Sequence, residues 1–147
     1  MLVCLLFGCA SVFAADTPTD PEPSAAQSME AGRSAIEAIN WSATITEFKA
    51  AEKEEPRNAD AHNLLAYSFR KQAKPDLSKA FEHYRTALKF NPDDKGAHEY
   101  SGEAYLMDKK PAEAEKYLAD LERICGNKTC EEYVDLARAI AQYKLQQ

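Results

Sequence analysis

Residues 60–69 read DAHNLLAYSF and residues 96–105 read GAHEYSGEAY, so one pattern returns after 36 positions. Each stretch places an Ala–His pair near its start and an aromatic residue at its end. Self-similarity at a period of 20–50 residues is typical of repeat proteins, in which each unit is one supersecondary element. The chain around these two stretches is therefore expected to consist of stacked units.

Landmark residues extend the repeat in both directions. The small residue of the first helix falls at Gly32, Ala66 and Gly102, with offsets of 34 and then 36. The second-helix landmarks, with offsets of 36 and then 34, are Thr44, Ala80 and Ala114; Phe48, Tyr84 and Leu118; and Ala51, Ala87 and Leu121. A two-residue insertion around 72–75, between the two helices of the middle unit, explains every shift. The underlying period is therefore about 34 residues with two helices per unit.

This pattern resembles the tetratricopeptide repeat family over about residues 25–128. The matching residues are Gly32, Phe48, Ala51 and Pro56 in the first unit; Leu65, Ala66, Phe69, Ala80, Tyr84, Ala87 and Pro92 in the second; and Gly102, Tyr105, Ala114, Leu118 and Leu121 in the third. The chain departs from the family pattern at Ala35, Thr44 and Gly126, where an aromatic residue, alanine and proline are usual. The resemblance implies an all-α fold, a right-handed α-solenoid of three helix–turn–helix units (25–58, 59–94 and 95–128) and a C-terminal capping helix.

Residues at the unit boundaries agree with this division. Pro56 and Pro92 are expected to end each second helix, because proline cannot continue one. Asn58 and Asp94 are suitable N-caps for the helices that follow, since their side-chain oxygens can accept free backbone N–H groups. We also expect Gly102 and the small Ala114 to let the two helices of the third unit approach closely.

The last segment, 129–147, reads TCEEYVDLARAIAQYKLQQ. Its apolar residues recur near a 3.6-residue period, and Thr129 with Glu132 has the spacing of a capping box. The end of a stacked array needs a cap with a polar outer face. We therefore predict a capping helix over this segment.

Composition narrows the class of protein. The chain has 147 residues, a formal net charge of −6, 5 Gly and 4 Cys. One domain is expected at this length. The negative charge argues against nucleic acid as a partner, because phosphate binding needs clustered Lys and Arg. Collagen-like, disulfide-scaffold and multi-span membrane classes are excluded.

The first 15 residues, MLVCLLFGCASVFAA, are uncharged and mostly apolar, and they are too few for a helix to cross a bilayer. They predict a signal peptide cleaved after Ala14 or Ala15, and hence export, with the bacterial periplasm as destination. Two alternatives remain. In the first, residues 6–9 (LFGC) resemble a bacterial lipobox, and Cys9 is lipidated and anchors the protein to the membrane. In the second, the 15 residues form a buried core helix. Residues 16–24, with three prolines, predict a disordered leader.

Cys125 and Cys130 remain after removal of the signal peptide. Gly126 suits the left-handed position after a helix, and the short turn brings both thiols within reach of each other. An exported protein meets an oxidising compartment, so we predict a disulfide between these two cysteines. The alternative is thiol redox chemistry, because Cys130 begins a helix beside Lys128, two features that favour the thiolate.

The sequence contains none of the usual catalytic motifs. We therefore expect no catalytic site, no metal site, no cofactor and no enzyme activity. His62 and His98 lie at equivalent positions of successive helices, too far apart to share a metal ion, and are interpreted as packing residues. His83 is expected at the surface, and Trp41 in packing. Residues 52–55, EKEE, are interpreted as a solvated helix end, with an acidic contact surface as the alternative.

The resemblance implies a concave groove, lined by the first helix of each unit, where a peptide or a partner helix binds. The corresponding positions are Met29, Arg33, Ile36, Asn63, Leu64, Tyr67, Arg70, Glu99, Tyr100, Glu103 and Leu106. Tyr and Arg are favoured anchors in such surfaces. Some of these residues could instead cover a neighbouring loop or the cap. The expected function is a protein-binding module or scaffold that assists assembly of an envelope complex. A redox protein and a purely structural envelope subunit are the alternatives.

Overall fold

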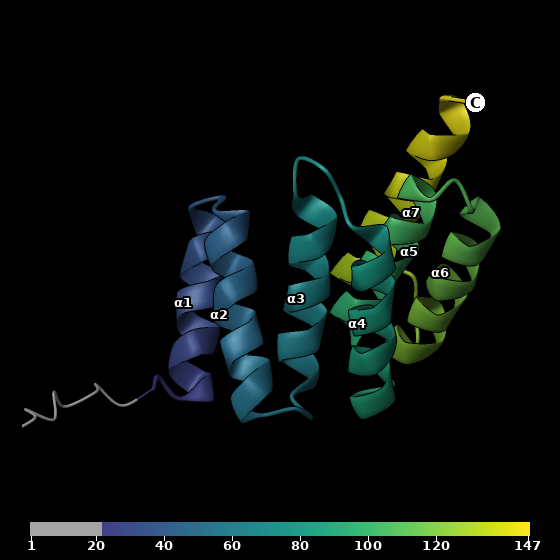
Figure 1. The fold of residues 1–147 in the computed structure, drawn as a ribbon. Helices are drawn as coiled ribbons and strands as arrows, with labels where there is room; N and C mark the ends of the chain where they lie inside the picture. Colours follow the sequence, from purple (N-terminus) through teal and green to yellow (C-terminus); the bar gives the residue numbers. More distant parts are fainter. Residues whose placement is uncertain (1–21) are drawn as a thin grey trace, which may run out of the picture.

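The computed structural model describes residues 22–147, which form seven α-helices and no strand (Figure 1). The helices are α1 (Ala25–Glu37), α2 (Trp41–Glu54), α3 (Ala59–Lys71), α4 (Leu77–Phe90), α5 (Lys95–Met107), α6 (Pro111–Cys125) and α7 (Glu131–Leu145). This confirms the all-α solenoid of three helix pairs and a final helix. None of these seven helices is long and apolar enough to cross a membrane. The predicted signal peptide, Cys9 and most of the leader lie outside the described residues.

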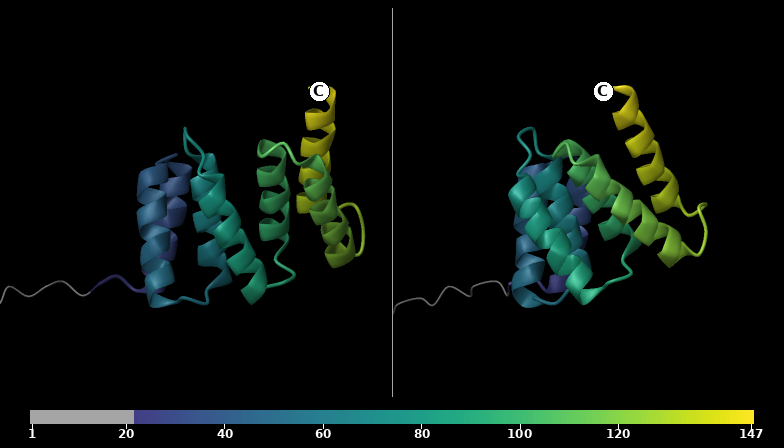
Figure 2. Two further views of the ribbon diagram at one scale, coloured as in Figure 1. Left: turned by 45° about the vertical axis from the view of Figure 1, so that its right-hand side comes forward. Right: turned by 90° about the vertical axis from the view of Figure 1, so that its right-hand side faces the viewer.

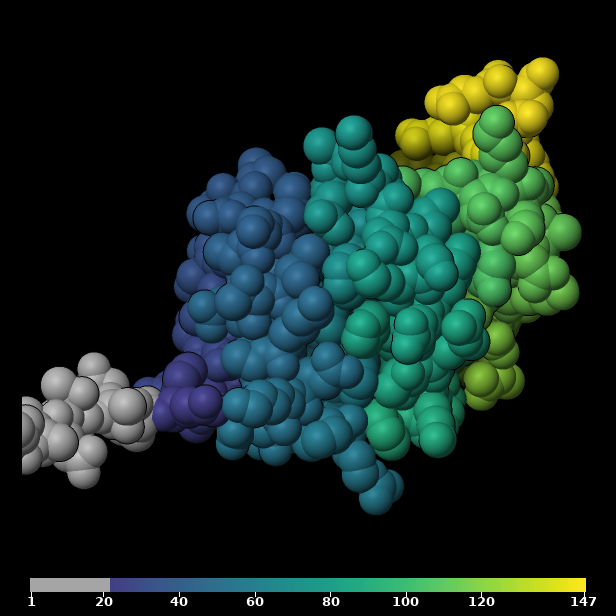
Figure 3. Space-filling model, in the orientation of Figure 1, coloured from purple at the N-terminus to yellow at the C-terminus, as the bar shows by residue number. Residues whose placement is uncertain are grey.

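The helices are arranged in two layers. Tyr67 of α3 contacts Tyr100 of α5, and Leu136 of α7 contacts Gly102 of α5. Together with the ion pair between Arg33 of α1 and Asp60 of α3, these contacts place α1, α3, α5 and α7 in one layer, with α2, α4 and α6 in the other. Figure 2 shows the pairs stacked side by side, and the C-terminal end of α7 extending past its neighbours. In the space-filling view the pairs form one continuous body (Figure 3). The capping helix packs against α5 and α6, the two helices of the last pair.

The turns within the three helix pairs differ in length as the insertion predicts. Residues 38–40 connect α1 to α2, and residues 108–110 connect α5 to α6. In the middle unit the connection runs over 72–76 and closes with a 3.0 Å bond from the N–H of Asp76 to the carbonyl of Phe69. This longer turn projects above α3 and α4 in Figure 1. The two-residue insertion is thus confirmed as a longer turn between α3 and α4.

Two clusters of buried side chains form the core. The first joins α1 to α5 and consists of Met29, Phe48, Ala51, Ala61, Leu65, Ala66, Phe69, Ala80, Tyr84 and Ala104. The second joins α5, α6 and α7 and consists of Leu106, Ala114, Leu121, Leu136 and Ile140. Stacked aromatic rings connect them, since Tyr105 lies 4.4 Å from Phe81 and 5.6 Å from Tyr117, measured between ring centroids. Each unit therefore buries its apolar face only with the help of its neighbour.

Gly32 and Gly102 lie at equivalent positions of their units, but each lets a different helix approach closely. A Cβ atom at Gly32 would lie 2.5 Å from the ring of Phe48, on the partner helix α2. At Gly102 it would lie 2.5 Å from Leu136, on the capping helix. The prediction that Gly102 brings together the two helices of its own unit is therefore wrong. Gly102 makes room for the cap.

The predicted helix ends are largely confirmed. The Asn58 side chain accepts from the N–H of Ala61 at 3.0 Å, and Asp94 accepts from Ala97 at 2.9 Å. Pro56 follows α2, Pro92 follows α4, and Pro111 occupies the first turn of α6.

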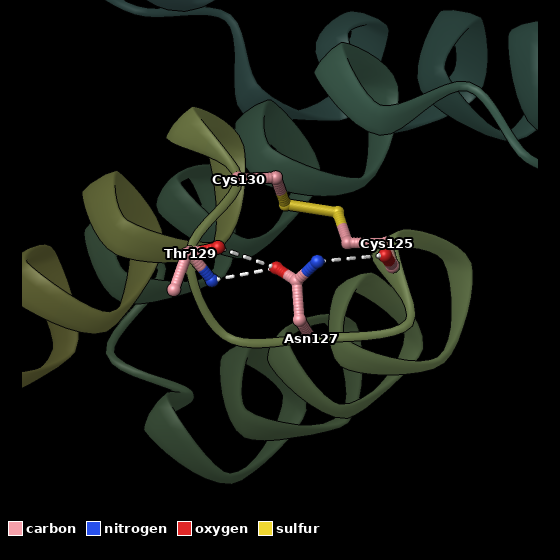
Figure 4. The surroundings of a disulfide bond; sticks show 4 residues. All are labelled: Cys125, Asn127, Thr129 and Cys130. Carbon is pink, nitrogen blue, oxygen red and sulfur yellow. Dashed lines mark hydrogen bonds between the residues drawn. A yellow bond between two sulfur atoms is a disulfide. The ribbon is translucent and has the colours of Figure 1, made fainter.

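The start of α7 differs from the prediction. The helix begins at Glu131 with Cys130 as its N-cap, and no side chain caps it. Thr129 is engaged elsewhere, because its N–H and its hydroxyl both donate to Asn127 Oδ1 at 2.8 Å (Figure 4). The capping box of Thr129 and Glu132 is therefore wrong, since a local turn uses the threonine.

Candidate functional site

The candidate site is the exposed side of α1, α3 and α5, which we call the first-helix face. All predicted groove residues lie on these three helices. Those with exposed or half-buried side chains are Arg33, Ile36, Leu64, Tyr67, Glu99, Tyr100 and Glu103. The buried ones are Met29, Asn63, Arg70 and Leu106. The prediction that these four residues line the groove surface is wrong, because their side chains are buried. The sequence period places a residue on a helix, but its depth depends on the neighbouring helix.

Aromatic rings form a row on this face. The ring centroids of Tyr67 and Tyr100 lie 4.9 Å apart, and that of Trp41 lies 5.9 Å from Tyr67 in an edge-on arrangement. The two tyrosines therefore touch, although they belong to successive units. Trp41 packs on the row as expected. Paired aromatic rings of this kind are rigid and amphipathic, as binding surfaces require.

The buried side chain of Arg70 contacts both tyrosine rings of the row and holds them in place. It is 6% exposed, and its guanidinium lies 5.4 Å from the ring of Tyr67 and 5.5 Å from that of Tyr100. Its Nη2 atom is 2.7 Å from Glu103, and its Nε donates to the Tyr84 hydroxyl at 3.3 Å. Arg70 thus connects α3, α4 and α5. Arg70 is therefore not an exposed anchor of the groove, because its guanidinium is buried and already pairs with Glu103 and Tyr84.

Acidic side chains border the row toward α7. Burial raises the pKa of Glu99 to about 7, and the nearby carboxylates of Glu103, Asp135 and Glu132 add to the shift. Burial likewise raises the pKa of Tyr100 to about 12. Glu103 already pairs with Arg70 and Asp135 with Arg138, so Glu99 is the carboxyl whose charged form a basic group of a partner would favour. At the other end of the face, Arg33 pairs with Asp60 at 2.8 Å, and both side chains are about half exposed.

The histidines lie partly as expected. His62 Nε2 is 2.9 Å from the carbonyl of Pro56, and His98 Nε2 is 2.8 Å from that of Pro92, so both are buried packing residues. His83 is not at the surface: its Nδ1 is 3.3 Å from His62 Nδ1, and burial lowers its pKa. Glu52 also turns inward, toward this pair, instead of into solvent. No sequence spacing marks these three residues as neighbours.

The cysteines lie at the turn between α6 and α7 (Figure 4). Their Cα atoms are 6.3 Å apart, and their sulfur atoms lie next to each other. Gly126 adopts the predicted left-handed conformation, with φ of 69°. The side chain of Asn127 donates to the carbonyl of Cys125 and accepts from Thr129, which holds the turn between the two cysteines.

Sequence reasoning missed a pocket between α5 and α7. It is lined by Leu106, Met107, Lys109, Ala139, Gln142 and Tyr143, among others. Met107 is among the few large apolar side chains exposed in residues 22–147. The apolar period of the last helix predicts a buried face, and it gives no sign of a pocket at the edge of that face.

Comparisons with known proteins agree with this architecture. The family model described as the tetratricopeptide repeat matches residues 29–95 and 73–128. The NMR structure of the first TPR domain of the human RPAP3 protein superposes with a TM-score of 0.68 and 16% sequence identity, covering 84% of this chain and 97% of that one. At this identity the likeness concerns the fold alone. No curated protein matches the chain.

Proposed function

We propose that this chain, which belongs to the tetratricopeptide repeat family, binds a peptide or helix of another protein on its first-helix face. Repeats of this family are protein–protein interaction modules, so the kind of partner follows from the family. The face itself is our proposal, and one observation supports it most: Tyr67 and Tyr100 are in contact across two units and are held by the buried Arg70. An ordered aromatic pair loses little entropy when a partner covers it.

The acidic border supports a basic partner segment. Glu99 and Glu103 lie on α5 beside the aromatic row, and Glu132 and Asp135 face them from α7. A lysine or arginine placed beside Glu99 would favour the charged form that the neighbouring carboxylates now disfavour. The proposed ligand is therefore an extended or helical segment that combines an apolar or aromatic side chain with a positive charge.

A peptide library tests this proposal directly. Peptides selected from a random library on the wild-type protein are expected to be enriched in Lys or Arg next to apolar residues. The combined variant Tyr67→Ala/Tyr100→Ala should weaken the best peptide by about 2 kcal/mol or more. Tyr143→Ala, which removes a half-buried tyrosine on α7, is the matched control and should bind normally.

Circular dichroism and thermal melting establish that each variant is folded before its binding is compared. Equal affinity of the double variant and the wild type would contradict the proposed face. Enrichment of acidic peptides would contradict the proposed charge of the partner.

We further propose that the protein acts outside the cytoplasm, in the periplasm, as a scaffold for an envelope complex. The apolar residues 1–15 and the proline-rich segment after them support export. Intact-mass measurement of the exported protein should give a chain that begins at Ala15 or Asp16. A species that retains Cys9 with added acyl mass would replace this proposal with a lipoprotein.

A disulfide between Cys125 and Cys130 belongs to the same proposal. The short turn held by Asn127 places both sulfur atoms within bonding reach, and an oxidising compartment would keep them paired. Thiol titration of the unfolded, unreduced mature protein should detect no free thiol. Two free thiols would overturn the pairing. The redox alternative gains no support from the comparisons, which point to an interaction module.

A further inference from the structure

Three potential metal ligands from three different helices converge between the first two units. His62 lies on α3, His83 on α4 and Glu52 near the end of α2. His62 Nδ1 is 3.3 Å from His83 Nδ1, and Glu52 Oε1 lies 3.5 Å from the former and 3.9 Å from the latter. One ligand atom of each residue thus lies within a sphere small enough for a single ion.

The contact with Pro56 determines the tautomer of His62, and hence which ring nitrogen offers a lone pair to the cluster. A carbonyl oxygen can only accept, so His62 Nε2, at 2.9 Å from it, must carry the hydrogen. In neutral imidazole this leaves Nδ1 without a hydrogen. Metal-bound histidines characteristically donate their other ring N–H to a carbonyl or carboxylate in this way. His62 therefore already has the tautomer and the orientation of a ligand.

The distances fit a zinc ion. Zinc binds imidazole nitrogen at about 2.0–2.1 Å in tetrahedral geometry, which places two nitrogen ligands about 3.3 Å from each other. The two Nδ1 atoms are 3.3 Å apart. Glu52 must move its oxygen by only a few tenths of an ångström, which a carboxylate at a helix end can do. His83, when bound through Nδ1, would carry its single ring hydrogen on Nε2.

Neighbouring rings hold the two imidazoles in place. Phe90 lies 5.8 Å from His62, and Phe69 lies 5.7 Å from His83, measured between ring centroids. The side chains of His62, His83 and Glu52 are 5%, 16% and 30% exposed, so the cluster is closed on the protein side and open at the carboxylate. An ion could enter at Glu52, and a water molecule could occupy its fourth position.

We propose that His62, His83 and Glu52 bind one divalent ion of the zinc class, which ties the first helix pair to the second. Two histidines and one carboxylate are a donor set that zinc uses with an open fourth position. The ion would join α2, α3 and α4, and so would stabilise the stacking of these units. This proposal is independent of peptide binding, since none of its ligands lies on the first-helix face.

The next unit offers a natural control. His98 makes the same bond to Pro92 as His62 makes to Pro56, yet its Nδ1 has no hydrogen-bond partner. Its neighbours are Tyr117, with ring centroids 5.7 Å apart, and Asp120, 4.0 Å from Nδ1. With a single histidine, this position lacks the donor set. His98→Gln therefore removes a buried histidine at an equivalent place without touching the proposed site.

Zinc titration of the full chain tests the proposal. The protein is first treated with a chelator, and zinc binding is then measured by competition with a chromophoric chelator and by thermal melting. Wild type and His98→Gln are expected to bind one zinc ion each with equal affinity. His83→Gln and Glu52→Gln should bind at least about tenfold more weakly. Zinc at about a hundred times its dissociation constant should raise the melting temperature of the wild type by roughly 8–10 °C.

Circular dichroism without zinc shows whether each variant folds. If His83→Gln loses helicity, Glu52→Gln decides, because its carboxylate is the most exposed ligand and lies at a helix end. The proposal is overturned if the wild type binds no zinc, or if Glu52→Gln binds zinc as tightly as the wild type. Equal weakening by His98→Gln and by the ligand variants would also overturn it, since zinc would then bind elsewhere.

Discussion

The N-terminal region, α1–α4, and the C-terminal region, α5–α7, are built from the same kind of helix pair, but the apolar face of the pair is covered differently in each. In the first region, each pair packs on another pair, and the core consists of alanines, Met29, Leu65 and the three rings of Phe48, Phe69 and Tyr84. In the second, a single helix covers the last pair, with Leu136 seated over Gly102. A unit that has another unit beside it buries its apolar face against that neighbour, which carries the same repeated pattern of residues. The last repeat needs a segment with its own sequence.

The same contrast holds for the two equivalent histidines. His62 meets His83 and Glu52, whereas His98 meets Tyr117 and Asp120, although both bind the carbonyl of a preceding proline. The shared bond belongs to the fold, because it closes the connection between units. The neighbours differ because side chains on adjacent helices vary independently of the repeat. Chemistry specific to one junction can therefore arise on a repeated backbone.

The largest expected losses of unfolding free energy come from truncating a large buried side chain in each of the two core clusters. Phe48→Ala should cost about 4 kcal/mol and Leu136→Ala about 3 kcal/mol of unfolding free energy, because both side chains are fully buried. Hydrogen exchange should show loosening of α1 and α2 in the first variant and of α7 in the second, since stability in stacked repeats is a sum of local and neighbour terms. Uniform loss of protection over all seven helices in both variants would show that the two regions unfold as one.

Arg70→Met tests the polar link between the regions. Arg70 on α3 pairs with Glu103 on α5, and its removal leaves the carboxylate and the Tyr84 hydroxyl without their partner. We expect a loss of about 2.5 kcal/mol, somewhat below the value for a fully buried pair because Glu103 is partly exposed. Arg33→Met, which breaks the solvent-exposed pair with Asp60, is the control and should cost less than about 0.5 kcal/mol. Similar losses in urea unfolding of the two variants would contradict the positioning role of Arg70.

Removing the proposed disulfide should affect the C-terminal region alone. The combined variant Cys125→Ser/Cys130→Ser opens a loop whose ends are five positions apart, so we expect a loss of about 2 kcal/mol at most. Amide protection should fall in α7 and remain in α1–α4. The wild type with reductant should behave like the variant, and an unchanged α7 in both would show that the cap does not depend on the bond.

The smallest effect is the pH dependence contributed by Glu99. Its pKa is about 7 in the folded protein against 4.5 as the ordinary value, so the folded state binds the proton more tightly than the unfolded state. Its contribution to stability is present below pH 4.5 and is lost as the pH rises through about 7. Glu99→Gln should therefore be more stable than the wild type at pH 8, by roughly 1 kcal/mol because the side chain is only half-buried, and should lose this advantage at pH 4. A difference that does not vary with pH would show that burial does not perturb this carboxyl.

The local features of the repeat could be predicted. The caps at Asn58 and Asp94, the longer middle turn and the left-handed Gly126 all depend on residues within a few positions of one another. The capping box at Thr129 was the exception, because the side chain of Asn127 competes for the same threonine. Such competition between two local hydrogen bonds has no clear sign in the order of the residues.

The site was predictable only in outline. The period placed Tyr67 and Tyr100 on one layer of helices, and they do lie together. It did not distinguish the buried Arg70 from the exposed Arg33, since both occupy first helices and have the same side chain. Their depth depends on what the next helix brings against them: Tyr84 and Glu103 in one case, solvent and Asp60 in the other.

The sequence by itself determined the helix pairs, their order and their family, because backbone hydrogen bonds, caps and apolar periodicity act over short separations along the chain. Only the tertiary structure decided which side chains meet across helices. Glu52 and His62 are 10 positions apart and His62 and His83 are 21 apart, spacings that belong to no motif, yet their ligand atoms converge. The rotation and close packing of α2, α3 and α4 bring them together, and these are set by the whole core at once.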